Sequence, residues 1–332
     1  MKVSVCMITY NHEKFIAQAI ESVMMQQTCF EYELVIGEDC STDKTREICI
    51  AYREKYPNKI KLLLREKNLG MMSNFIQTIQ SCQGQYIALC EGDDYWISPH
   101  KLQKQVDFLD SHPDFAICSH NVRVSREGRP ELDHEWLGVK RKEVSTLEDL
   151  LRDGSGGATC SLVFRNRVFG DFPDWYYTIK GGDWALQVLC ATRGKLRYLR
   201  EVMGVFRQHD RGSLYAATTD AKSKGEEAIA LPSKGTLQLY DILDKHFNYR
   251  YKKIIRKPKA YLYWVGAVEY AQYGRKDLAR VWLLKALPGF FPTPHGITFR
   301  TFLTSLPRIL LPSPLIHFLN SVKSIAKKLH IK

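Results

Sequence analysis

Three carboxylates within four positions, Glu91, Asp93 and Asp94, are the residues of this chain best suited to chemistry. They follow an apolar run, Tyr86 to Cys90, that predicts a buried strand. Like charges at a strand end cost folding energy unless a cation or a positively polarised ligand lies beside them. Oxygen ligands at this spacing suit Mg²⁺ or Mn²⁺, which complete their shell with substrate phosphates. The alternative interpretation is an acidic surface turn without a ligand.

Three earlier apolar runs also predict strands, and each is followed by polar residues and then by a helical pattern. The runs are Lys2–Ile8, Tyr32–Ile36 and Ile60–Leu64, and the polar residues after them are Thr9, Tyr10 and Asn11; Glu38 and Asp39; and Arg65, Asn68 and Gly70. This alternation predicts an α/β fold, Rossmann-like, with a mostly parallel central sheet and helices on both faces. Ligands of such sheets bind beyond the carboxyl ends of the strands, so we expect one site at that edge. Segment 41–43 is expected to cap the helix that follows the second strand.

The segment Gly181 to Trp184 is the best candidate for a catalytic carboxylate in the second half of the chain. A reaction that removes a proton from a hydroxyl group needs a general base, and Asp183 opens an apolar helix whose dipole favours a carboxylate. The alternative is that Asp183 only caps this helix. Gly182 allows a close backbone approach, and Trp184 either lines an acceptor pocket or belongs to the core. Asp171 and Asp174 are weaker candidates for the base.

A further strand is expected over residues 201–206, and Arg207, His209 and Arg211 follow it. The two arginines are candidate partners of a phosphate. A histidine in a polar loop is commonly solvated, so His209 is either a metal ligand or an ordinary surface residue. The glycine-rich segment 154–159 lacks the phosphate-binding loop pattern and is expected to form a flexible acceptor-side loop before a strand at 160–164.

The order and spacing of these motifs resemble the inverting glycosyltransferases of family 2, which have the GT-A fold. The resemblance covers roughly residues 1–215 and is carried by TYN at 9–11, IGEDCSTDKT at 36–45, NLG at 68–70, EGDD at 91–94 and GGDW at 181–184. The ending EGDDYW resembles a bacterial subgroup of sugar transferases for surface polysaccharides. The chain has Glu38 and Glu91 where the commoner family pattern has aspartate, which keeps the charge but extends the reach by one methylene.

The resemblance assigns roles to individual residues. It implies a uracil nucleotide whose ring N–H donates to Asp39. It also implies an Mn²⁺ or Mg²⁺ ion, and it makes Asp183 the catalytic base. The implied nucleotide-sugar site comprises Thr9, Tyr10, Asn11, Glu38, Asp39, Arg65, Asn68, Gly70, Asp93 and Arg207, the implied metal ligands are Glu91, Asp93, Asp94 and His209, and the acceptor side has Gly182 and Trp184. Ordinary alternatives stand beside two of these: Tyr10 as an aromatic cover of the sheet edge, and Arg65 as a structural ion pair.

Charge is distributed unevenly along the 332 residues. Residues 245–332 hold 17 Lys and Arg against two acidic residues, whereas residues 1–244 hold 31 against 34. The basic surplus indicates an anionic partner for the C-terminal region. Nine cysteines without a C-x-x-C pair suggest reduced, buried thiols in a cytoplasmic protein, and the start at a core strand predicts no signal peptide.

The C-terminal sequence predicts a helical hairpin at 259–287, turning at Gly274, followed by a basic and apolar segment at 297–329. Three prolines and several charges interrupt that segment, so it fits a membrane surface better than a membrane span. The alternative is a helical tail packed on the catalytic domain. No motif that reads nucleic acid accompanies the charge, so nucleic acid is not an expected partner.

Together these patterns predict a catalytic domain at 1–215, with a nucleotide-sugar half at 1–110 and an acceptor half at 111–215, and a basic helical region at 216–332. The predicted enzyme transfers a sugar from a nucleotide-diphosphate sugar, a UDP-sugar, to a hydroxyl of a surface glycan, with a lipid-linked acceptor as one candidate. We expect it at the inner face of the bacterial membrane, and leave its oligomeric state open. Alternatives are a sugar-nucleotide nucleotidyltransferase, whose basic glycine-rich phosphate loop is missing after Ile8, and a non-catalytic nucleotide- or carbohydrate-binding module.

Overall fold

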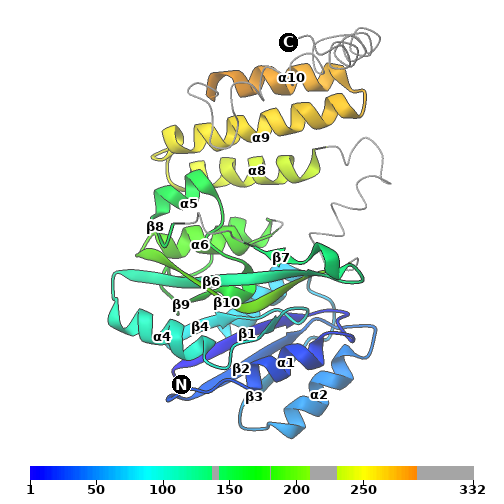
Figure 1. The fold of residues 1–332 in the computed structure, drawn as a ribbon, viewed down its shortest axis with the longest axis vertical. Coiled ribbons are helices and arrows are strands. Elements are labelled where there is room, and N and C mark those ends of the chain that lie inside the picture. The colour runs from blue at the N-terminus through cyan, green and yellow to red at the C-terminus, as the bar shows by residue number, and fades with distance from the viewer. Residues whose placement is uncertain (137–141, 180, 210–229, 290–332) are drawn as a thin grey trace, which may run out of the picture. The chain divides into compact units, whose positions relative to one another are not determined.

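The computed structural model describes residues 1–136, 142–179, 181–209 and 230–289 (Figure 1). The chain divides into two compact units, residues 1–215 and 216–332. The first unit is built on one mixed sheet, and the described part of the second is helical.

The sheet of the first unit has the strand order β3-β2-β1-β4-β9-β6-β10-β5 among the described residues, with β7 beside β6 and β8 beside β10. Strands β3, β2, β1 and β4 are parallel, β9 is antiparallel to its neighbours β4 and β6, and β10 is parallel to β6. The bounds are β1 Val3–Thr9, β2 Tyr32–Glu38, β3 Ile60–Leu64, β4 Tyr86–Leu89, β5 Tyr95–Trp96, β6 Phe115–Arg126, β7 His134–Glu135, β8 Val144–Ser145, β9 Val163–Arg165 and β10 Lys195–Gln208. The predicted α/β fold with a mostly parallel sheet is confirmed.

Helices connect these strands: α1 Ile16–Met24, α2 Thr45–Lys55, α3 Met71–Gln80, α4 Lys101–Ser111, α5 Leu147–Asp153 and α6 Asp183–Ala191, with short 3₁₀ turns at Pro130–Leu132, Thr159–Ser161 and Asp174–Tyr177. Figure 1 shows α1 and α2 on the same side of the sheet. After β3 the chain returns past β2 and β1 to form β4 on the other side of β1. Because such crossovers are right-handed, this reversal of direction places α3 on the face of the sheet opposite to α1 and α2. The core between these layers is apolar: α1 buries Ile16, Ala19, Ile20 and Val23, and every residue of β1 is buried.

Within segment 41–43, Asp43 supplies the predicted cap of α2, because its Oδ1 accepts from the N–H of Thr45, the first residue of the helix, at 2.9 Å. Lys44, between Asp43 and the helix, makes no side-chain hydrogen bond to the helix. The segment also holds the loop after β1, since Ser41 Oγ accepts from the Asn11 N–H at 3.0 Å and the Thr42 N–H donates to Asn11 Oδ1 at 2.9 Å. Asn11 itself has a φ of 57°, a value that asparagine tolerates better than most residues. The two loops that follow β1 and β2 are therefore joined.

The glycine-rich segment 154–159 is a packed turn and not an open, flexible loop. The Gly156 N–H donates to Gln187 Oε1 at 2.6 Å, and the Gly156 carbonyl accepts from Ser119 Oγ at 2.9 Å. A Cβ atom on Gly157 would lie 2.7 Å from the Ser119 side chain, so glycine is needed there for packing. The strand that follows begins at Val163, later than expected, because a 3₁₀ turn comes first.

The described part of the second unit has α8 Leu231–His246, α9 Lys252–Gln272, α10 Lys276–Ala286 and a short 3₁₀ turn at Leu287–Gly289. Helices α9 and α10 form the predicted hairpin, with Gly274 at a φ of 79° in its turn. Ala267, Tyr270, Ala279 and Leu283 are buried between them. The predicted surface segment 297–329 lies outside the described residues. No helix in the described ranges has both the length and the apolar character needed to cross a bilayer.

Candidate active site

The predicted polar clusters meet at one edge of the sheet. Strand β1 lies between β2 and β4, so successive connections leave it in opposite directions along the sheet. A crevice forms at such a switch point, and ligands of open α/β sheets bind there. Thr9 ends β1, Asp39 follows β2, and the acidic turn 91–94 follows β4. The sequence therefore brings these residues to the part of the sheet where a ligand site is expected.

The acidic turn divides its carboxylates between two environments. Glu91 and Asp93 line a cavity, whereas the Asp94 side chain is fully buried and its Oδ1 accepts from the Arg207 backbone N–H at 2.8 Å. Gly92 makes the close fit to β1, because a Cβ atom there would lie 2.6 Å from Thr9 Oγ1 and 3.1 Å from His12 Nδ1. Glu91, Asp93 and Asp94 still offer oxygens within 4.8 Å of one another. Asp94 thus supports the turn from the interior of the protein.

A cavity of about 140 Å³ opens above this turn. Its polar side chains include Glu91, Asp93, Asp183 and Arg207, and its apolar wall includes Met71, Met72, Phe75, Tyr176 and Phe206. Burial and the neighbouring Asp93 and Asp94 raise the pKa of Glu91 well above its usual range. Burial also raises the pKa of Asp183. A cavity that concentrates carboxylates in apolar surroundings is suited to a cation and to proton transfer.

Asp183 begins α6, and the geometry before it is tight. Tyr176 Oη donates to the Gly182 carbonyl at 2.8 Å, and a Cβ atom on Gly182 would lie 2.5 Å from Tyr176 Oη. Trp184 points away from the cavity, since it is buried and its Nε1 donates to the Leu150 carbonyl at 3.0 Å. Trp184 therefore belongs to the core, as its alternative interpretation had it. Asp174 does not line the cavity either.

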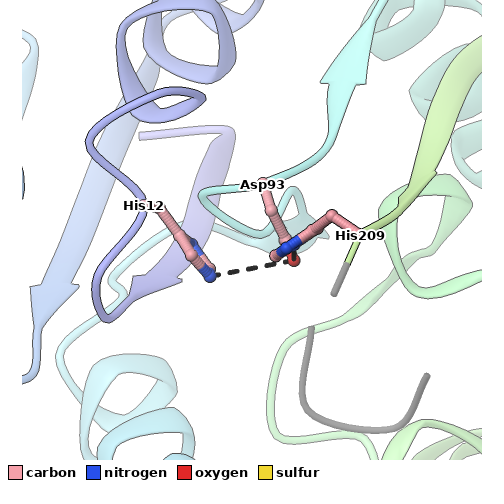
Figure 2. A group of neighbouring side chains, drawn as sticks. All are labelled: His12, Asp93 and His209. Carbon is pink, nitrogen blue, oxygen red and sulfur yellow. Dashed lines mark hydrogen bonds and ion pairs between the residues drawn. The ribbon is translucent and has the colours of Figure 1, made fainter. Parts of the chain in front are cut away.

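Two imidazoles reach the acidic turn from different parts of the chain (Figure 2). His209 is buried, and its Nε2 lies 3.0 Å from Asp93 Oδ2. His12, in the loop between β1 and α1, has its Nε2 3.8 Å from the same oxygen. Phe15 packs against both rings, at centroid distances of 4.7 Å from His209 and 6.5 Å from His12. His209 is therefore a buried partner of Asp93 and not a solvated residue.

Arg207 joins the end of β10 to the acidic turn. Its Nη1 donates to the Asp93 carbonyl at 2.8 Å, and its Nη2 donates to the Gln18 side chain. The guanidinium carbon lies 4.4 Å from the Tyr95 ring centroid and 5.0 Å from that of Phe15. Arg207 also lines the cavity, so its guanidinium group can face a phosphate there while it keeps these contacts.

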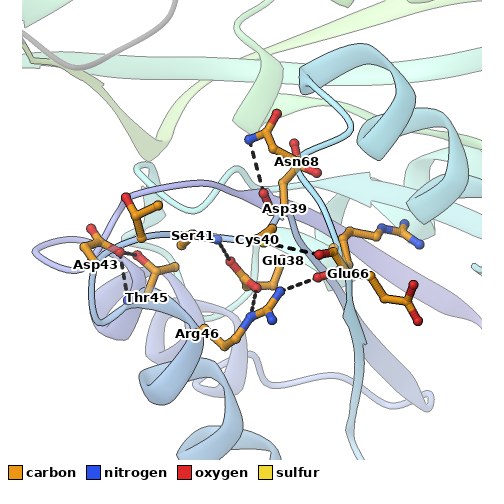
Figure 3. Close-up of polar contacts among 12 residues, drawn as sticks. Glu38, Asp39, Cys40, Ser41, Asp43, Thr45, Arg46, Glu66 and Asn68 are labelled. Atoms are coloured by element: carbon orange, nitrogen blue, oxygen red, sulfur yellow. Dashed lines mark hydrogen bonds and ion pairs between the residues drawn. The ribbon is translucent and has the colours of Figure 1, made fainter.

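Asp39, in the loop after β2, is held by backbone amides of the loop that follows β3, and Figure 3 shows Asn68 of that loop beside it. Its Oδ1 accepts from the Leu69 N–H at 2.8 Å and its Oδ2 from the Gly70 N–H at 3.0 Å, while Asn68 Nδ2 donates to the Asp39 carbonyl at 3.2 Å. Burial raises the pKa of Asp39. Gly70 adopts a φ of 80°, which only glycine takes without strain. Asp39, Asn68 and Gly70 therefore form one rigid corner.

Glu38 and Arg65 support this corner from below. The Glu38 side chain is fully buried, its Oε1 accepts from the Ser41 N–H at 2.7 Å and its Oε2 pairs with Arg46 (Figure 3). Arg65 Nε donates to Asn74 Oδ1 at 3.0 Å. Because the Glu38 side chain is fully buried and paired with the Arg46 cation, it is shielded from a bound nucleotide sugar, and we assign it a positioning role.

The residues that follow β1 differ in exposure. Thr9 is 2% exposed and its Oγ1 has no hydrogen-bond partner among the described residues, whereas Tyr10 is 41% exposed. A base stacked on Tyr10 would be compatible with this exposure. Asn11 is occupied by Ser41 and Thr42 and shapes the loop.

Sequence reasoning missed two residues of the site. His12 lies three positions beyond the end of β1. Its nearness in sequence to the candidate residues Thr9, Tyr10 and Asn11 was the only indication that it belongs to the site. Trp136 lines the cavity and packs edge-on against Phe206 at a centroid distance of 5.2 Å. No periodicity or motif marks Trp136, because it is brought to the cavity by the pairing of β7 with β6. Arg211, an expected phosphate partner, lies outside the described residues.

The comparison with known families decides the identity of the catalytic unit. The model of Glycosyl transferase family 2 matches residues 4–169, half of the chain. The chain belongs to glycosyl transferase family 2. Asp183, Arg207 and His209 lie beyond the matched residues, so their assignment depends on the geometry described above.

Among curated relatives, the uncharacterized protein Rv1520 of Mycobacterium tuberculosis is 38% identical over 221 residues, which is 66% of this chain and 62% of the relative. The chain thus spans less than two thirds of that relative's length. The poly(ribitol-phosphate) β-N-acetylglucosaminyltransferase TarS of Staphylococcus aureus is 32% identical over 133 residues, 40% of this chain and 23% of TarS.

Solved structures support the GT-A fold. The structure of TarS residues 1–349 with UDP-GlcNAc superposes with a TM-score of 0.53 and 18% identity, covering 87% of this chain and 92% of that one. The mannosyltransferase PcManGT of Pyrobaculum calidifontis, solved with GDP-Man and Mn²⁺, gives 0.56 and 15% identity, covering 96% and 82%. At these identities the likeness concerns the fold alone.

Proposed function

We propose that this protein is a metal-dependent, inverting glycosyltransferase that moves a sugar from a nucleotide-diphosphate sugar to a hydroxyl group of a surface-glycan acceptor. One observation carries the proposal: Glu91, Asp93 and Asp183 line the same cavity, at the switch point of the sheet of a family 2 chain. Membership of that family also argues against the nucleotidyltransferase alternative.

The residues beside the cavity fit a divalent ion. Carboxylates from the acidic turn lie within 4.8 Å of one another, and Asp93 also faces an imidazole at 3.0 Å. A buried atom of a neighbouring side chain, His12 Nδ1, has no hydrogen-bond partner in the described ranges, although such atoms usually find one. Asp93 and His209 would hold Mn²⁺ or Mg²⁺, with Glu91 facing the donor. When bound, the ion would neutralise charge on the diphosphate leaving group.

Asp183 is the proposed base. Its carboxylate would accept the proton of the acceptor hydroxyl, whose oxygen forms a bond to the anomeric carbon as the bond from that carbon to the diphosphate oxygen breaks. Attack from the face opposite the nucleotide inverts the anomeric configuration. Burial raises the pKa of Asp183, which strengthens it as a base, and the apolar wall of Met72 and Phe75 keeps bulk water from competing with the acceptor.

The nucleotide would lie on the Asp39 corner. Backbone amides already hold both Asp39 oxygens, but each oxygen can accept a second hydrogen bond, such as that of a uracil N–H. Tyr10 is exposed enough to lie against the base. TarS has been solved with UDP-GlcNAc, which supports a UDP-sugar as donor, whereas PcManGT was solved with GDP-Man.

The first experiment is a calorimetric titration of the full chain with UDP, GDP, CDP and dTDP, each with and without Mn²⁺. We expect UDP to bind tightest and to need the ion. The matching sugar nucleotides are then screened for release of the nucleoside diphosphate in the presence of glycan acceptors. An absence of nucleotide binding under every condition would contradict the proposal.

The base is tested with Asp183→Asn and the control Asp174→Asn, whose carboxylate lies outside the cavity. Asp183→Asn should bind nucleotide and ion as the wild type does but lose transfer by about 10²- to 10⁴-fold, the usual contribution of a general base. The control should retain transfer. Near wild-type transfer by Asp183→Asn would exclude Asp183 as the base.

The two units would divide the work, with catalysis in residues 1–215 and contact with an anionic membrane in residues 216–332. In the second unit α9 exposes Lys253, Arg256 and Lys257, and α10 exposes Val281 and the 65%-exposed Leu284. Basic and apolar side chains together suit a surface of anionic lipid. Such contact would place the protein at the inner face of the membrane, where a lipid-linked glycan acceptor is available.

Lipid contact is tested by sedimenting the full chain with vesicles. Phosphatidylglycerol vesicles should retain it at low salt, and phosphatidylcholine vesicles should not. Replacing Lys253, Arg256 and Lys257 by glutamine should reduce retention, whereas the same exchange at three exposed lysines of the first unit, Lys14, Lys104 and Lys195, should not. Equal retention on both lipids would exclude an electrostatic membrane contact.

A further inference from the structure

Three side chains from distant parts of the first unit converge on one point (Figure 2). Asp93 comes from the turn after β4, His209 follows β10, and His12 follows β1. Their ligand atoms all lie within 4.8 Å of one another. His12 lies 81 positions before Asp93 in the sequence and His209 lies 116 positions after it, yet both imidazoles face the same oxygen, Asp93 Oδ2.

The position of His12 is not explained by ordinary hydrogen bonding. Its Nδ1 is buried without a partner among the described residues, and its Nε2 stops 3.8 Å from Asp93 Oδ2, beyond hydrogen-bond distance. Two ligand atoms that share an ion at about 2.1 Å lie roughly 3.0 to 3.5 Å apart at octahedral or tetrahedral angles. The separations of 3.0 and 3.8 Å from Asp93 Oδ2 to the two imidazoles are near that range.

The surroundings hold His12 in this position. Its backbone N–H donates to Thr45 Oγ1 at 2.8 Å, and its carbonyl accepts from the Phe15 N–H at 2.9 Å. The Phe15 ring packs against the imidazoles of both His12 and His209. Gly92 lets the acidic turn approach, since a Cβ atom there would lie 3.1 Å from His12 Nδ1. The ring is therefore positioned before any ligand binds.

We propose that His12 is a third protein ligand beside Asp93 and His209, and that it makes the centre select transition-metal ions over Mg²⁺. Imidazole nitrogen suits first-row transition ions, whereas Mg²⁺ prefers oxygen ligands and gives up water reluctantly. Two imidazoles and one carboxylate form a donor set of the first kind. The inference rests on the proposed metal-dependent function, but it concerns binding of the ion alone.

The test uses the full chain without nucleotide. Titration calorimetry measures the Kd of Mn²⁺ and of Mg²⁺ for the wild type, for His12→Asn and for the control His100→Asn, which replaces an exposed histidine before α4. We expect the wild type to favour Mn²⁺. His12→Asn should weaken Mn²⁺ by about 10- to 100-fold, as loss of one metal-supporting group commonly does, and Mg²⁺ much less. The control should match the wild type.

Two results would overturn the inference. One is unchanged Mn²⁺ affinity in His12→Asn, which together with weaker UDP binding would assign His12 to the diphosphate. The other is an equal loss for both ions. If His12→Asn does not fold, electron spin-echo spectra of Mn²⁺ on the wild type count the bound imidazoles: two are expected, and one would refute the proposal. A chain that binds Mn²⁺ through His12 but transfers no sugar would refute the proposed function alone.

Discussion

Lys101 provides a quantitative test of how the core beneath the acidic turn is built. Its side chain is fully buried at the start of α4, and its Nζ has no hydrogen-bond partner among the described residues. The ammonium group lies 3.9 Å from the Trp96 ring centroid, a cation–π contact that replaces only part of the lost hydration. Burial lowers the pKa of Lys101 from 10.5 to about 7.

This pKa sets the size and sign of a pH effect. A lysine whose pKa falls on folding binds more protons in the unfolded state between about pH 7 and pH 10.5, so stability rises with pH in that window. Integrating over the shift gives a cost to the native state of about 4 kcal/mol at pH 7 and about 2 kcal/mol at pH 9. The nearby groups stay neutral when folded, because burial raises the pKa values of Cys90, Cys118 and Cys160 and lowers that of His120 to about 3.

We expect Lys101→Met to remove this cost while keeping a side chain of similar length against Trp96. Its free energy of unfolding should exceed that of the wild type by up to about 4 kcal/mol at pH 7, and by about 2 kcal/mol less at pH 9. Urea denaturation of both proteins, followed by tryptophan fluorescence, measures the two differences. The change between the two pH values is the decisive quantity, since differences in packing do not depend on pH.

The control is Lys104→Met, one turn along the same helix, where the lysine is half-exposed and pairs with Glu201 at 2.6 Å. Surface pairs contribute less than about 1 kcal/mol, so its effect should be small and equal at pH 7 and pH 9. The reasoning would be refuted if Lys101→Met were less stable than the wild type at pH 7, or if its gain were the same at both pH values.

Three further changes test the support of the site. Gly92→Ala should lower Mn²⁺ affinity more than tenfold in calorimetry, because its Cβ would lie 2.6 Å from Thr9 Oγ1. The control Gly235→Ala, in open space on α8, should leave Mn²⁺ affinity unchanged and add up to about 1 kcal/mol of stability. Equal Mn²⁺ affinities of the two variants would contradict the steric argument. Asp94→Asn should keep Mn²⁺ affinity within about threefold, since its Oδ1 can still accept from the Arg207 N–H. A loss of Mn²⁺ affinity of about 10- to 100-fold would instead show that Asp94 is a metal ligand. Arg46→Met should cost about 3 to 5 kcal/mol in urea denaturation by leaving Glu38 buried without its cation, and adding Glu38→Gln should recover much of the loss; no recovery would mean that Arg46 acts through packing.

Much of the fold could be predicted from the sequence because its first half is regular. Strand Ile60–Leu64 has the predicted bounds, and the expected strand and helix pattern up to the acidic turn differs from the structure by only a few residues at the ends. Parallel strands end at one edge, so polar residues after each strand had to meet there. The antiparallel strand β9 and the packed turn before it were harder, since their neighbours lie far away in sequence.

The environment of each carboxylate could not be predicted from spacing. Asp93 and Asp94 are adjacent and chemically identical, yet one lines the cavity and the other is buried beneath it. The difference depends on a backbone N–H of Arg207, which lies 113 positions after Asp94. Likewise, no local pattern indicates that the imidazole of His12 faces Asp93 and not solvent.

The end of β10 completes the site by holding the acidic turn at several points. Arg207 donates its backbone N–H to Asp94 Oδ1 and its guanidinium to the Asp93 carbonyl, and two residues later His209 meets Asp93 Oδ2. The orientation of Asp93 is thus fixed by the same short segment that supplies its imidazole partner. Because the loop of His12 packs on that imidazole through Phe15, a change at any one of these positions should move the others. The metal centre is therefore expected to form as a unit, from three segments that are separate in the sequence.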